Sequence, residues 1–110
     1  MTATANLRAA YRAFERAVDM AARLDADAHT RLVLAYKTHL VRLSPEALPQ
    51  PARARFLRLH DELCGWPPGD PVQDYTAHFK ALYPEQAADL LAQLVELKNA
   101  VRLLLEEHDA

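Results

Sequence analysis

Apolar positions along this chain recur at spacings of three and four residues, the period of an α-helix that buries one face. Over about residues 4–24 the stripe consists of Leu7, Tyr11, Phe14, Val18 and Ala21. A second stripe covers about residues 28–43, with no glycine or proline between the two. A single helix over Ala5–Leu43 is therefore an alternative, but Asp25 or Asp27 can cap a second helix. We predict two helices.

All seven prolines fall between the periodic segments. Proline breaks a helix interior but is favoured in the first turn, so Pro51, Pro71 and Pro84 indicate three further helix starts. The pattern predicts helices over about 51–64, 71–82 and 84–107, with an irregular loop over 65–70. The last segment is the most apolar. We expect an all-α, compact four- to five-helix bundle, mostly antiparallel, with the long C-terminal helix at its centre and one domain over 1–110.

Composition narrows the class of protein. The chain has 110 residues, of which 51% are hydrophobic and 25% charged, as in an ordinary globular domain. The net charge of −2 gives no general attraction to nucleic acid or to an anionic membrane. Neither a signal-peptide pattern nor an apolar run of about 20 residues is present. We therefore expect a cytoplasmic protein without a membrane segment, and the excess of arginine over lysine suggests a bacterial one.

No pattern for catalysis or metal binding emerges. His60 and Cys64 are four residues apart and could both ligate a soft metal, but a tetrahedral site needs further ligands that the sequence does not supply. Ser44 is an apparent helix cap. Cys64 follows a predicted helix C-terminus, where the helix dipole raises the pKa of a thiol. We predict a protein that is not an enzyme and holds no cofactor.

Two features exceed what folding requires. The first is apolar surface outside the main stripes, at Leu34, Val41, Leu91, Val95 and Leu105. Either neighbouring helices of the monomer cover these residues, or a subunit contact does. The second is the loop that contains Trp66, Pro67 and Pro68, which either closes the end of the bundle or anchors a partner. These features predict a non-catalytic interaction or regulatory module (an adaptor, chaperone-like or neutralising protein) that binds another protein or forms a homodimer.

Two alternatives belong to other functional classes. A small-ligand pocket or an active site between helices would use His60, Tyr36, Tyr75 and His78, although the pattern favours His60 as a partly buried, hydrogen-bonded histidine. A nucleic-acid regulator would use Arg53, Arg55 and Arg58. Three arginines fall short of the roughly 6–10 phosphate contacts that binding needs, unless a dimer doubles them.

Overall fold

The computed structural model describes residues 3–41, 43–64 and 80–109. Its elements are α1 (Ala3–Arg23), α2 (Ala28–His39), the 3-10 turn η1 (Pro45–Ala47), α3 (Ala52–Leu63) and α4 (Pro84–Asp109). No β-strand forms within these ranges. The all-α class is confirmed, and α3 and α4 begin at or next to Pro51 and Pro84, as predicted.

α1 and α2 are separate helices, as predicted. Residues 24–27 are not helical. The side chain of Asp27 accepts a hydrogen bond from the Thr30 amide at 2.7 Å, which satisfies one of the free amides at the start of α2. The break is therefore produced by a carboxylate cap, without the help of a glycine or a proline.

Two predicted helix ends are wrong. α2 stops at His39 rather than near Leu43, because the amides of Leu40 and Val41 both donate to the Tyr36 carbonyl, at 2.9 and 3.0 Å. The helix predicted over 71–82 does not extend to Leu82, because residues 80–83 are not helical.

Lys80 explains the second of these differences. Its amide donates to the Leu63 carbonyl at 2.8 Å, and its ammonium donates to the Asp61 carbonyl at 2.7 Å. The segment before α4 is therefore hydrogen-bonded to the end of α3 instead of to a helix of its own. The predicted helix over 71–79 and the loop over 65–70 lie outside the described residues.

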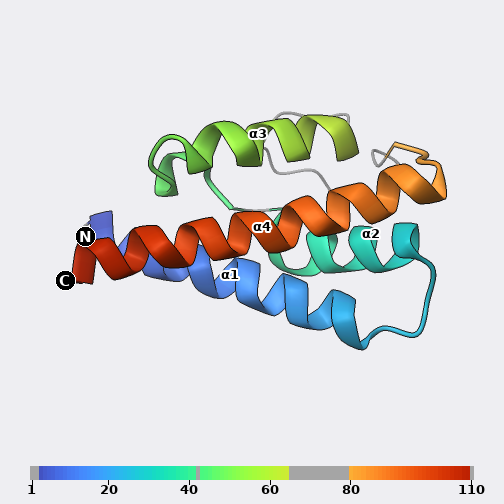
Figure 1. Ribbon diagram of the computed structural model, residues 1–110, viewed down its shortest axis with the longest axis horizontal. Helices are drawn as coiled ribbons and strands as arrows, with labels where there is room; N and C mark the ends of the chain where they lie inside the picture. Colours follow the sequence, from blue (N-terminus) through green and yellow to red (C-terminus); the bar gives the residue numbers. More distant parts are fainter. Residues whose placement is uncertain (1–2, 42, 65–79, 110) are drawn as a thin grey trace.

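α4 contacts α1, α2 and α3, and α1 also contacts α2. Figure 1 shows α3 on one side of α4 and α1 on the other, with the start of α1 and the end of α4 at the same end of the molecule. The apolar stripe of α4 is buried at Ala87, Leu90, Leu94, Leu97 and Val101. This stripe therefore supplies the surface that the other helices share.

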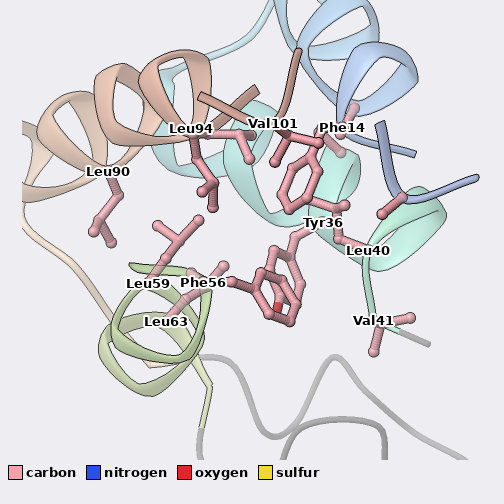
Figure 2. Packing of buried hydrophobic residues seen from close by; sticks show 14 of the residues in the cluster. Phe14, Tyr36, Leu40, Val41, Phe56, Leu59, Leu63, Leu90, Leu94 and Val101 are labelled. Atoms are coloured by element: carbon pink, nitrogen blue, oxygen red, sulfur yellow. The ribbon is translucent and has the colours of Figure 1, made fainter. Parts of the chain in front are cut away.

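Three aromatic rings from three helices meet in the core. The rings of Phe14 in α1 and Phe56 in α3 pack edge to face with centroids 5.8 Å apart. Tyr36 of α2 stacks on Phe56 at 6.4 Å. Figure 2 shows these side chains beside the leucines of α3 and α4. Such pairs contribute about 0.5–1.5 kcal/mol beyond the burial of their area, so the cluster links α1, α2 and α3 directly.

Candidate functional site

Tyr36 and His60, two residues of the predicted ligand pocket, do come together. The Tyr36 hydroxyl and Nδ1 of His60 form a hydrogen bond between α2 and α3. Both side chains are buried. Burial raises the pKa of Tyr36 well above its ordinary value, and nearby Cys64 acts in the same direction. The pair therefore has the geometry of a satisfied polar contact inside the core.

The other members of that predicted pocket, Tyr75 and His78, lie outside the described residues. Two cavities open elsewhere, and neither is lined by Tyr36 or His60. The ligand-pocket alternative at His60 thus stays a prediction. What the structure adds is that Nδ1 of His60 is already occupied by the Tyr36 hydroxyl.

Cys64 lies beside this pair at the end of α3. Its amide donates to the His60 carbonyl at 2.7 Å, and its side chain is buried. Burial raises the pKa of the thiol to about 12, while the positive charge of Lys80 acts in the opposite direction. The direction agrees with the sequence analysis, and desolvation of the buried thiol is the main cause. Within the described residues, no three His, Cys, Asp or Glu side chains gather at a possible metal site.

The predicted interaction residues divide into four groups. Val41 is only 5% exposed and belongs to the core, so for this residue the alternative of cover within the monomer holds. Leu91 and Leu105 are partly buried against the core. Leu34 and Val95 are exposed, at 37% and 40%. Trp66, Pro67 and Pro68 lie outside the described residues.

An apolar groove of about 270 Å³ brings two of these residues together. It lies between α1, α2 and α4. Five α4 residues line it, namely Ala88, Leu91, Ala92, Leu94 and Val95. From α1 come Val18, Ala21 and Ala22. Four of these eight side chains are alanines, which project little from the helices and so leave space between them.

Arg31 of α2 is the one charged residue lining this groove, and sequence analysis missed it. Nη1 of Arg31 donates to the Ala21 carbonyl at 3.4 Å, across the break between α1 and α2. Nε of Arg31 is buried and has no hydrogen-bond partner. The signal in the sequence was an arginine directly before Leu32, at the edge of the predicted apolar stripe.

The three arginines of the nucleic-acid alternative have different neighbours. Nε of Arg53 donates to the Pro45 and Leu48 carbonyls, at 3.1 and 2.9 Å, and so holds η1 against α3. Arg55 and Arg58 line a cavity of about 350 Å³ between α3 and α4. Glu62 and Glu96 line the same cavity, and the Glu96 carboxylate lies 3.6 Å from the Arg55 guanidinium. A phosphate at this site would meet two carboxylates, which disfavours nucleic acid.

Comparison of the chain with protein-family models, with curated proteins and with solved structures finds no match. None of the helices in the described parts of the chain has the length and apolar character needed to cross a membrane. The chemistry of the groove and of the exposed side chains is therefore the basis for assigning a function.

Proposed function

We propose that this chain is a non-catalytic interaction or regulatory module of the bacterial cytoplasm, which binds another protein or a second copy of itself. The observation that carries the proposal is the open apolar groove between α1, α2 and α4, in which Val95 is 40% exposed. Contiguous exposed apolar surface marks protein-binding sites and ligand-binding grooves.

The scaffold we propose for this surface is a mostly antiparallel bundle with α4 at its centre. The contacts of α4 with the other three long helices support it. Leu34 lies three residues after Arg31 in α2, so the two side chains project from neighbouring positions on one side of the helix. A homodimer through α2 and α4 would cover Leu34 and Val95 together.

The proposal is tested by placing a charge on this surface. Val95→Glu should leave the fold intact, because the side chain is exposed, but should break a contact that buries it. Leu57→Glu is the matched control, because Leu57 is 36% exposed and belongs to α3 rather than to the groove. Sedimentation should give a dimer for the wild type and for Leu57→Glu, and a monomer for Val95→Glu.

If the wild type sediments as a monomer, self-association is wrong and a different protein partner is required. Affinity capture from the host with the same three proteins then decides. A partner retained by the wild type and by Leu57→Glu, and lost by Val95→Glu, would support the module. A partner retained equally by all three would contradict a role for this groove.

A further inference from the structure

Arg31 is the charged residue among those that line the apolar groove. Its Nη1 makes a single hydrogen bond, at 3.4 Å, and its Nε is buried with no partner. No ion pair forms at Arg31 within the described residues. Asp27 is near enough for Arg31 to contribute to its lowered pKa, but the Asp27 carboxylate is used to cap α2. A partly buried cation without a counter-ion is energetically costly, and a bound carboxylate would reduce that cost.

The rest of the groove is suited to hydrocarbon. Val18, Leu91 and Val95 supply aliphatic surface, and Ala22 and Ala92 leave the space between the helices open. Its volume of about 270 Å³ is slightly below the range for sites that hold drug-sized ligands, roughly 300–1,000 Å³, so the groove suits a smaller molecule. The lining on α4 runs from Ala88 to Val95, about 10 Å along the helix. This length accommodates a short apolar chain.

We propose that the groove binds a small apolar monocarboxylate, with the carboxylate at the Arg31 guanidinium and the hydrocarbon against Val18, Leu91 and Val95. The positive charge of Arg31 favours a carboxylate, because the planar guanidinium presents several donors in the arrangement that a carboxylate accepts. The aliphatic side chains of the groove favour a hydrocarbon tail, because its burial removes apolar surface from water. The ligand would occupy the same groove as the proposed protein contact and would compete with it for Val95, but the site itself requires no protein partner.

Titration calorimetry of the full chain with octanoate tests the proposal. Octanoate should bind saturably, and 1-octanol and octylammonium should bind at least about tenfold more weakly, because neither offers an anion to Arg31. Arg31→Gln should weaken octanoate binding by at least about tenfold. Arg58→Gln removes the same charge from an exposed arginine outside the groove, so it should leave the affinity unchanged.

A second variant guards against a folding defect in Arg31→Gln. Ala92 is exposed and lines the groove, so Ala92→Leu should fill the site while the helix content measured by circular dichroism is retained. This variant should lose octanoate binding. Octanoate binding that survives in Arg31→Gln or in Ala92→Leu overturns the proposal, as does equal affinity for 1-octanol.

Absence of saturable octanoate binding by the wild type also overturns it. If Val95→Glu still converts a dimer into a monomer in that case, the groove belongs to a second copy of the chain. The proposed function then stands while the carboxylate site fails. The two proposals are therefore tested by separate measurements.

Discussion

The Tyr36 hydroxyl and Nδ1 of His60 form a hydrogen bond inside the core, and so join α2 to α3. Their rings are 5.6 Å apart, and Phe56 packs against both. A polar contact enclosed by aromatic rings is satisfied only when both helices are in place. This contact therefore specifies how α3 is seated on the rest of the protein.

Tyr36→Phe should destabilise the protein by about 1–3 kcal/mol, because it leaves a buried histidine nitrogen without the hydroxyl. Urea unfolding of Tyr36→Phe, His60→Leu and the double variant measures the coupling between the two side chains. The double variant should lose less stability than the two single losses added together. Strict additivity would show that the hydrogen bond contributes nothing to folding.

Asp27 makes stability depend on acid pH. Its hydrogen bonds with Thr30 hold the pKa of the Asp27 carboxyl below its ordinary value. The stabilisation is therefore present above the ordinary pKa of aspartate and is lost as pH falls through the lower, folded value. Asparagine also caps helices but does not titrate in this range. Asp27→Asn should have a melting temperature that falls less than that of the wild type between pH 5 and pH 2.

A second carboxylate, Glu46, also loses a stabilising contact in acid, and it does so equally in the wild type and in Asp27→Asn. The Ser44 hydroxyl donates a hydrogen bond to the Glu46 carboxylate and lowers the pKa of Glu46, so acid weakens this contact in both proteins.

Asp27→Ala should be less stable than Asp27→Asn at neutral pH, because alanine cannot cap α2. Parallel melting curves for the wild type and Asp27→Asn across this pH range would contradict a role for the charge.

The Cys64 thiol should be unreactive in the folded protein. Its pKa of about 12 leaves almost no thiolate at pH 8, and the side chain is buried. Alkylation by iodoacetamide, followed by mass spectrometry, should be slow in buffer and fast in urea. Rapid labelling of the native protein at pH 8 would contradict this, and Lys80→Ala would then test whether the nearby charge is responsible.

Truncating a core side chain should lower the unfolding free energy more when that side chain is more deeply buried. Leu94 and Phe14 are fully buried, so Leu94→Ala and Phe14→Ala should each lose about 2–5 kcal/mol of unfolding free energy. Leu57→Ala is the control, since Leu57 is 36% exposed and should lose clearly less. Circular dichroism during urea unfolding measures all three. Equal losses at Leu94 and Leu57 would contradict the packing of α4.

Helix positions were predictable because their signals are local. The spacing of Leu7, Tyr11 and Phe14 places them on one helix face whatever that face contacts. Proline and aspartate act within one turn, so the starts of α2 and α4 could be predicted from Asp27 and Pro84. The end of α2 and the segment at residue 80 could not, since hydrogen bonds to the Tyr36 and Leu63 carbonyls decide them.

The sequence by itself determined the helical class, the starts of α2, α3 and α4, and the identity of most core side chains. Tertiary structure alone decided that Val41 is buried while Val95 is exposed, and that Arg31 lies at the apolar groove. The reason is physical. A helix period specifies which residues share a face, but the burial of that face depends on neighbours that are distant in the chain. The same holds for Tyr36 and His60, which are 24 residues apart.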